Sequence, residues 1–179
     1  MKKVFLGLAF VLSLMILGAG TAHAQQSLEP RPSPLSLSTM KFEDAYVKIT
    51  YNRPHKKGRT IFGDLVPYGQ VWRVGANEAT EITVTKDVKL GGKTLPAGTY
   101  TLFAVPNPDK WTIIVNKDLG QWGAYRYNKE NDLFSFDVPT QKTAEVYEPF
   151  TIEFEKKNVK STNLLMKWDE TMVAIPFEF

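Results

Sequence analysis

Apolar and polar residues alternate along most of the chain from Ala45 onward. This period of two predicts β-strands, because successive side chains of a strand point to opposite faces. The first such run places four apolar residues on one face, namely Ala45, Val47, Ile49 and Tyr51. Similar short runs recur to the end of the chain, separated by Gly and Pro turn signals, and none has the apolar stripe of a three-turn helix. We therefore expect an all-β fold, a single antiparallel β-sandwich or barrel of about nine or ten strands.

Two segments qualify this pattern. Residues 122–127 and 133–138 predict a pair of hairpin strands joined by a polar connection. Residues 53–69 break the strand rhythm, since they are first basic and then interrupted by Gly and Pro. Long loops in small domains are often functional, so we expect this loop to contribute to any site.

The N-terminus has the three parts of a secretory signal peptide. Lys2 and Lys3 supply the positive region, residues 4–17 are almost all apolar, and Ala22-His23-Ala24 offers a cleavage site. The apolar stretch is short for a membrane span and a cleavage site follows it directly. We expect cleavage after Ala24, export to a periplasmic or extracellular location, and no transmembrane segment in the mature chain.

The predicted mature chain begins with a Pro- and Ser-rich stretch. Pro30, Pro32 and Pro34 favour extended backbone and remove amide donors. The sequence therefore predicts a signal peptide at residues 1–24, a tether at 25–40 and one all-β domain at 41–179.

Composition excludes several kinds of chemistry. The chain has no cysteine, so it has neither disulfides nor a thiol nucleophile, and His55 is the one histidine left after the predicted cleavage. No metal site and no cofactor are expected, because zinc sites need several His or Cys ligands. Of the 22 basic residues two lie in the leader, which leaves 20 against 19 acidic ones. This near balance argues against nucleic acid as a partner.

Several long motifs lie between these strands. The longest is VPYGQVWRVGANEAT at residues 66–80, accompanied by KGRTIFG at 57–63 and LPAGTY at 95–100. Together they resemble a family of secreted bacterial proteins of unknown function, over nearly all of residues 41–179. The resemblance implies an envelope-exported all-β domain and brings no established activity or catalytic residue.

The segment at residues 72–78 contains the strongest candidates for a site. In one interpretation Arg73 and Asn77 donate hydrogen bonds in a polar pocket, Glu78 accepts, and Trp72 forms an apolar wall. In the other, Arg73 and Glu78 form an internal ion pair and Asn77 satisfies buried amides, so the segment is architectural.

Further candidates flank this segment. The basic loop with Arg53 and His55 predicts either a solvated turn or a subsite for a carboxylate, phosphate or sulfate. Tyr68 and Trp122 would suit a glycan if they met Trp72 in one groove, although tryptophans are more often part of a core.

The leading hypothesis is a non-enzymatic binding or accessory module for a small polar or carbohydrate-like ligand. Its candidate ligand-binding residues are Arg53, His55, Tyr68, Trp72, Arg73, Asn77, Glu78 and Trp122. The alternatives are a structural or protein-interaction domain that contacts an envelope protein, and a hydrolase that uses Glu78. The sequence favours a non-enzymatic function over an enzymatic one.

Overall fold

The structure is a computed structural model that describes residues 30–155 and 160–179. It has nine strands and one short 3-10 helix in these ranges: β1 (Leu35–Phe42), β2 (Ala45–Asn52), β3 (Thr80–Val84), β4 (Val88–Leu90), β5 (Lys93–Leu95), β6 (Gly98–Pro106), β7 (Lys110–Asn116), η1 (Lys129–Asn131), β8 (Asp132–Phe154) and β9 (Ser161–Glu178). No helix in this part of the chain is long and apolar enough to cross a membrane.

All nine strands belong to one sheet in the order β1-β2-β3-β6-β7-β8-β9-β4-β5, and every neighbouring pair is antiparallel. The predicted all-β antiparallel class and the number of strands are confirmed. The sheet stays open because β1 and β5 form its two ends in this order.

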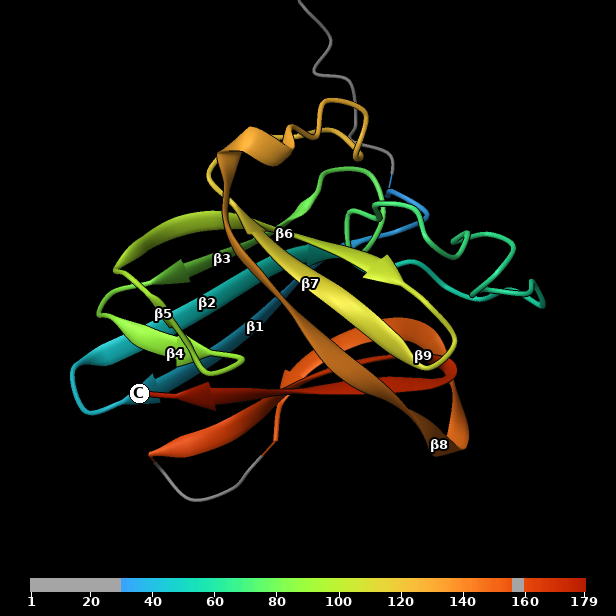
Figure 1. Ribbon diagram of the computed structural model, residues 1–179. Coiled ribbons are helices and arrows are strands. Elements are labelled where there is room, and N and C mark those ends of the chain that lie inside the picture. Colours follow the sequence, from blue (N-terminus) through green and yellow to red (C-terminus); the bar gives the residue numbers. More distant parts are fainter. Residues whose placement is uncertain (1–29, 156–159) are drawn as a thin grey trace, which may run out of the picture. The chain divides into compact units, whose positions relative to one another are not determined.

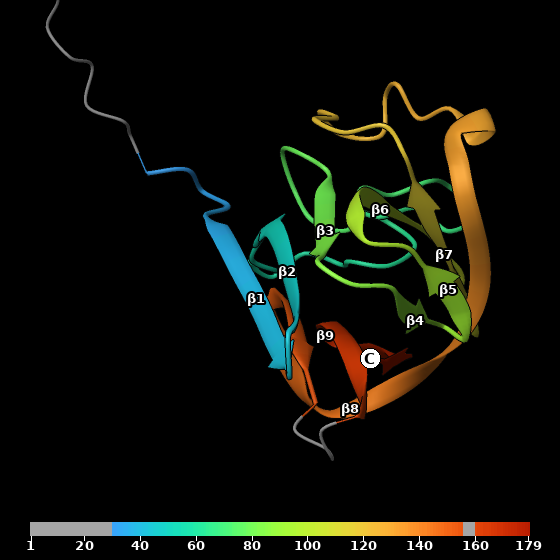
Figure 2. The same cartoon turned by 90° about the vertical axis from the view of Figure 1, so that its left-hand side faces the viewer.

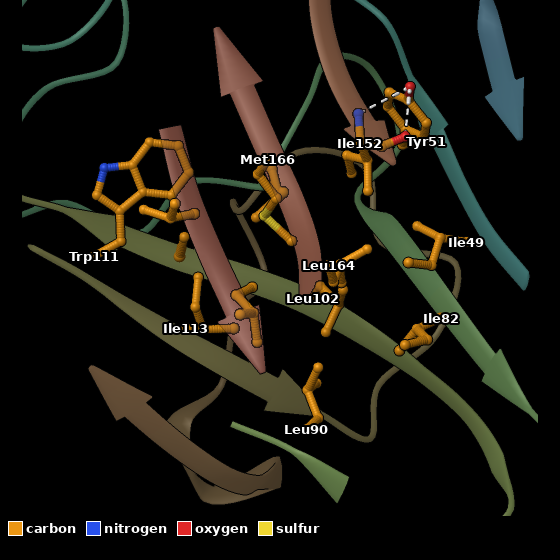
Figure 3. Packing of buried hydrophobic residues seen from close by; sticks show 14 of the residues in the cluster. Ile49, Tyr51, Ile82, Leu90, Leu102, Trp111, Ile113, Ile152, Leu164 and Met166 are labelled. Carbon is orange, nitrogen blue, oxygen red and sulfur yellow. Dashed lines mark hydrogen bonds between the residues drawn. The ribbon is translucent and has the colours of Figure 1, made fainter. Parts of the chain in front are cut away.

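The long strand β8 connects two halves of the sheet, β1-β2-β3-β6-β7 on one side and β9-β4-β5 on the other. Its first part pairs with β7 and its second part with β9, and the register with β9 shifts twice after Lys142. Such irregularities bend a strand. The strand β8 runs across the domain in Figure 1, and the sheet curls back on itself in Figure 2. The Tyr51 hydroxyl of β2 accepts a hydrogen bond from the Ile152 amide of β8 at 3.1 Å, so the two halves face each other (Figure 3).

The core between the two halves follows the predicted alternation. In β2, Ala45, Val47, Ile49 and Tyr51 are all buried. Residues from the other half, such as Leu164 and Met166 of β9, are fully buried in the same cluster (Figure 3). Burial of these side chains is the main favourable term for folding.

The chain differs from the sequence-based expectations at two places. The strand β1 occupies residues 35–42, which overlap the segment assigned to the tether. Its leucines point outward and are exposed, so they contribute no core signal, and the pairing with β2 depends on the backbone. The hairpin predicted for residues 122–127 and 133–138 is not formed. Residues 122–127 form a loop, in line with the positive φ angles of Gly120 and Gly123, and residues 133–138 pair with β7.

A buried aromatic cluster anchors the long loop between β2 and β3. Trp72 inserts from this loop, is 6% exposed, and lies 5.1 Å from Phe150, 5.7 Å from Trp111 and 6.1 Å from Trp168 between ring centroids. Its backbone also exchanges two hydrogen bonds with Ala104 of β6, at 2.7 and 2.9 Å. The loop is therefore held in place by the core.

Gly75 lies where this loop crosses the end of β2. Its φ is 150°, and a Cβ added there would lie 2.8 Å from the Asn52 carbonyl oxygen. That backbone conformation is essentially restricted to glycine.

We expect Gly75→Ala to destabilise the protein more than Gly69→Ala. The Gly69 variant measures the cost of a positive φ alone, because an added methyl group meets no neighbour there. Gly69 has a φ of 73° and open space around it, so its replacement should cost about 1–2 kcal/mol. Gly75→Ala should cost about 1–3 kcal/mol more, because the added methyl group collides with backbone. Urea unfolding of both variants measures the difference, and equal losses would contradict the close approach.

Candidate functional site

The loop segment at residues 73–78 lies between two hollows on the domain surface. It is fixed by Thr80, whose amide donates to the Arg73 carbonyl at 3.1 Å and whose hydroxyl donates to the Val74 carbonyl at 2.5 Å. Val74 and Asn77 have φ angles of 56° and 54°. A positive φ is rare for a β-branched residue, and such backbone strain often occurs at ligand sites.

The first hollow, which we call the guanidinium cleft, has a volume of about 280 Å³. Its polar lining comes from Arg59, Arg73, Asn77 and Ser33, and its apolar lining includes Trp72, Trp168, Leu65 and Val66. No carboxylate side chain lines the cleft. Two guanidinium groups without an acidic neighbour make this a site of positive potential.

Arg73 is held in the cleft without a complete set of partners. Its Nε is buried and donates to no atom in the described part of the chain. Burial lowers the pKa of the guanidinium, and the nearby Tyr125 opposes this shift. A buried donor without an acceptor costs free energy unless a ligand or water satisfies it.

Arg59 faces the same cleft from the basic loop. Its Nε donates to the Lys56 carbonyl at 2.9 Å, and its Nη2 donates to the His55 carbonyl at 2.6 Å. Among the residues that the structure describes, neither Arg59 nor Arg73 forms an ion pair with a carboxylate. The two positive charges are therefore free to attract an anion from solution.

The second hollow, about 540 Å³ in volume, lies on the other side of the loop and contains Glu78 and Glu81. Arg31 Nη1 donates to the two carboxylate oxygens of Glu78 at 2.7 and 2.9 Å, and Asn52 Nδ2 donates to one of them at 2.9 Å. The hydrogen bond from Arg31 is the largest cause that lowers the pKa of Glu78. The carboxylate is thus held ionised and its oxygens are occupied.

Residues 31–34 form a strap between the two hollows. Arg31 binds Glu78, the Ser33 carbonyl accepts a bond from Asn77 Nδ2 at 3.4 Å, and the Pro34 carbonyl accepts one from the Arg53 amide at 2.9 Å. The segment that the sequence assigned to a tether therefore forms one wall of each hollow.

The predicted site residues are only partly brought together. Trp72, Arg73 and Asn77 line the guanidinium cleft, whereas Glu78 lines the second hollow. The ion pair between Arg73 and Glu78, which the architectural interpretation required, is not formed.

The other candidates line neither hollow. Arg53 donates to the Phe150 carbonyl at 3.2 Å and to the Thr151 hydroxyl at 2.9 Å, and the backbone of His55 forms a bridge with Pro149. Tyr68 is partly exposed, and Trp122 is 57% exposed on a separate loop. The aromatic groove proposed for a glycan is not assembled, because Trp72 is in the core.

Sequence reasoning missed three contributors to the site. Arg59 belongs to the basic loop, in which Arg53 and His55 were the predicted site residues, and Arg31 and Asn52 gave no local signal. Arg31 lies in the Pro-rich stretch and Asn52 at the end of β2, so only their contacts with Glu78 identify them. No group of three or more His, Asp or Glu side chains that could hold a metal occurs within residues 30–155 and 160–179.

We expect Glu78→Gln to lower stability by at most about 1 kcal/mol near neutral pH, because both ion-pair partners are substantially exposed. The folded-state pKa lies below the unfolded value of about 4.3, so the pair stabilises the protein above that pH. Its contribution is lost as the pH falls through the folded-state pKa. The wild-type advantage over the variant should therefore disappear in acid.

Urea unfolding of wild type, Glu78→Gln, Arg31→Gln and the double variant checks this at neutral pH and near pH 3. The two single losses should not add, because each removes the same pair. Additive losses, or a wild-type advantage that survives in acid, would contradict the assignment.

Comparison with known proteins identifies the family alone. The model of a protein family of unknown function, DUF2911, matches residues 33–177, which include β1, the strap residues Ser33 and Pro34, and both hollows except for Arg31. No curated protein and no solved structure matches the chain. The chain belongs to the DUF2911 family of proteins of unknown function.

Proposed function

We propose that this protein is an exported, non-enzymatic module that binds a small anionic ligand in the guanidinium cleft. The observation that carries the proposal is Arg73, whose buried Nε has no hydrogen-bond acceptor among the described residues although it lines an open cleft. A carboxylate or phosphate oxygen would supply that acceptor.

The cost of desolvating the Arg73 guanidinium supports an anionic ligand at this site. Moving a guanidinium out of water is costly, and proteins usually recover the cost through a paired carboxylate. Arg73 has no such partner within the described part of the chain. An anion would pair with the charge and satisfy the donor together, so the site is more complete with a ligand than without one.

The size and donors of the cleft define the class of ligand. A volume of about 280 Å³ suits a small molecule. Guanidinium forks bind carboxylate and phosphate oxygens with two parallel hydrogen bonds. Leu65, which lines the cleft and is 42% exposed, offers an apolar surface to the rest of the ligand. A small carboxylate or phosphate compound fits these features.

The alternatives are less well supported. A hydrolase that uses Glu78 as a proton donor needs a raised pKa, whereas Arg31 and Asn52 hold this carboxylate ionised and occupied. A purely architectural role would explain Trp72, Val74 and Gly75, but it leaves the unpartnered Arg73 without a function.

We expect Arg73→Gln to weaken anion binding at least about tenfold, since charge-assisted hydrogen bonds are the stronger kind. Isothermal titration calorimetry with inorganic phosphate and with succinate measures this. Arg126→Gln is the matched control, because it removes one positive charge from an exposed position that lines neither hollow.

The same variants separate binding from architecture. Without anion, Arg73→Gln should unfold at the same urea concentration as wild type or a higher one, because a half-buried guanidinium whose Nε has no acceptor is removed. No heat with either anion in wild type would reject the proposed function. A loss of several kcal/mol in anion-free Arg73→Gln would assign the residue to the architecture of the loop.

Export is the second part of the proposal. It is supported by the charged start at Lys2 and Lys3, the apolar residues 4–17 and the Ala-His-Ala site that ends at Ala24. These residues precede the described part of the chain. We propose that the binding module works in the periplasm or outside the cell.

The full chain produced in a Gram-negative host should be recovered from the periplasmic fraction with Gln25 as its first residue. N-terminal sequencing and intact mass measure this directly. Replacing Ala22 and Ala24 with bulky residues should block the cleavage, because signal peptidase requires small side chains there. An uncleaved cytoplasmic product would contradict the proposal.

A further inference from the structure

We propose that the ion pair between Arg31 and Glu78 holds the strap of residues 31–34 against the guanidinium cleft and thereby raises the affinity of the cleft for its anion. This inference rests on the proposed function and adds a contact that controls it. Arg31 and Glu78 act as positioning residues, because both line the second hollow, whereas Ser33 is the strap residue that lines the cleft.

The strap is held from both of its ends. On one side it continues into β1 at the edge of the sheet (Figure 2), and the Pro34 carbonyl accepts a hydrogen bond from the Arg53 amide at 2.9 Å. On the other side Arg31 Nη1 donates to both carboxylate oxygens of Glu78, at 2.7 and 2.9 Å. Ser33 lies between these two attachments and is half-buried in the wall of the cleft. Its position therefore depends on both.

A closed ring of hydrogen bonds connects the ion pair with the cleft. Asn52 Nδ2 donates to Glu78 at 2.9 Å, and Asn52 Oδ1 accepts from Asn77 Nδ2 at 3.4 Å. Asn77 Nδ2 also donates to the Ser33 carbonyl at 3.4 Å, and Ser33 is two residues from Arg31, which closes the ring. Asn52 is 1% exposed, so the ring passes through a buried amide. The ion pair thus acts on two residues that line the cleft, Asn77 and Ser33.

A closed strap favours anion binding because it limits the access of water to Arg73, which lines the same cleft as Ser33. The attraction between opposite charges is stronger where water is excluded, since the effective dielectric constant is lower. When only the closed strap gives the tight site, the observed dissociation constant rises as the closed fraction falls. By linkage, a bound anion favours the closed strap by the same factor.

Charge reversal at Glu78 separates this role from simple electrostatics. Glu78→Arg adds positive charge next to Asn77 of the cleft, so electrostatics alone would tighten phosphate binding. The same change breaks the ion pair and places two guanidinium groups together. We therefore expect the dissociation constant for inorganic phosphate to rise at least about threefold.

Glu81→Arg is the matched control for the change in charge. Glu81 lines the same hollow as Glu78, but it accepts a hydrogen bond from the Gly120 amide at 2.9 Å and forms no ion pair with the strap in the described part of the chain. This variant should bind phosphate as tightly as wild type or more tightly.

The exchanged pair tests whether the contact itself matters. Arg31→Glu combined with Glu78→Arg has the net charge of wild type and can form the same ion pair in reverse, so it should recover the affinity that Glu78→Arg loses. Isothermal titration calorimetry with inorganic phosphate measures all four proteins. Glu78→Arg that binds at least as tightly as wild type overturns the inference, and so does a double variant as weak as Glu78→Arg.

Hydrogen exchange followed by NMR observes the strap without relying on affinity. Exchange of the Arg53 amide reports its bond to the Pro34 carbonyl. It should be faster in anion-free Glu78→Arg than in wild type, and phosphate should slow it in wild type. The Thr85 amide, which donates to the Tyr46 carbonyl at 3.0 Å, is the internal control for global stability.

The two measurements distinguish the failure of this inference from the failure of the proposed function. Wild type that binds no phosphate rejects the proposed function and this inference with it. Wild type that binds phosphate, with an Arg53 amide that responds neither to Glu78→Arg nor to phosphate, overturns this inference alone.

Discussion

The insertion of Trp72 into the aromatic core is the interaction on which the rest of the site depends. The loop between β2 and β3 has little regular structure, and Trp72 fixes it by packing against Trp111, Phe150 and Trp168 from three different strands. The indole Nε1 also donates to the Gly75 carbonyl at 3.2 Å, which ties the next turn to the same anchor. A loop held in this way can keep strained backbone at its tip.

Arg73 follows this anchor directly, so its position is set by the core and not by a charged partner. The same loop then turns through Val74 and Asn77 and delivers Glu78 to the opposite side, where Arg31 pairs with it. The two sides differ in charge: one hollow has two guanidinium groups without a carboxylate, and the other has two carboxylates with one guanidinium. The segment at residues 73–78 thus separates a hollow in which Glu78 is paired with Arg31 from a cleft in which Arg73 Nε has no acceptor.

Much of the fold could be predicted, and the misses have physical causes. The alternation in β2 identified its buried face because one side of that strand packs in the core. The strand β1 was not predicted, because its leucines face solvent and its pairing with β2 depends on the backbone. No apolar alternation on a buried face therefore marked it in the sequence. In the candidate site, Trp72, Arg73 and Asn77 lie close together in the sequence and line one cleft, whereas Arg31 and Asn52 carried no local signal.

The sequence by itself determined that the domain is built of antiparallel strands, because burial of every second side chain is a local property that periodicity records. Only the tertiary structure decided which charges are paired. Arg31 and Glu78 are 47 residues apart, and Arg73 is left unpartnered, because the curl of the sheet and the course of the strap set which side chains meet. Local patterns carry no information about such distant neighbours.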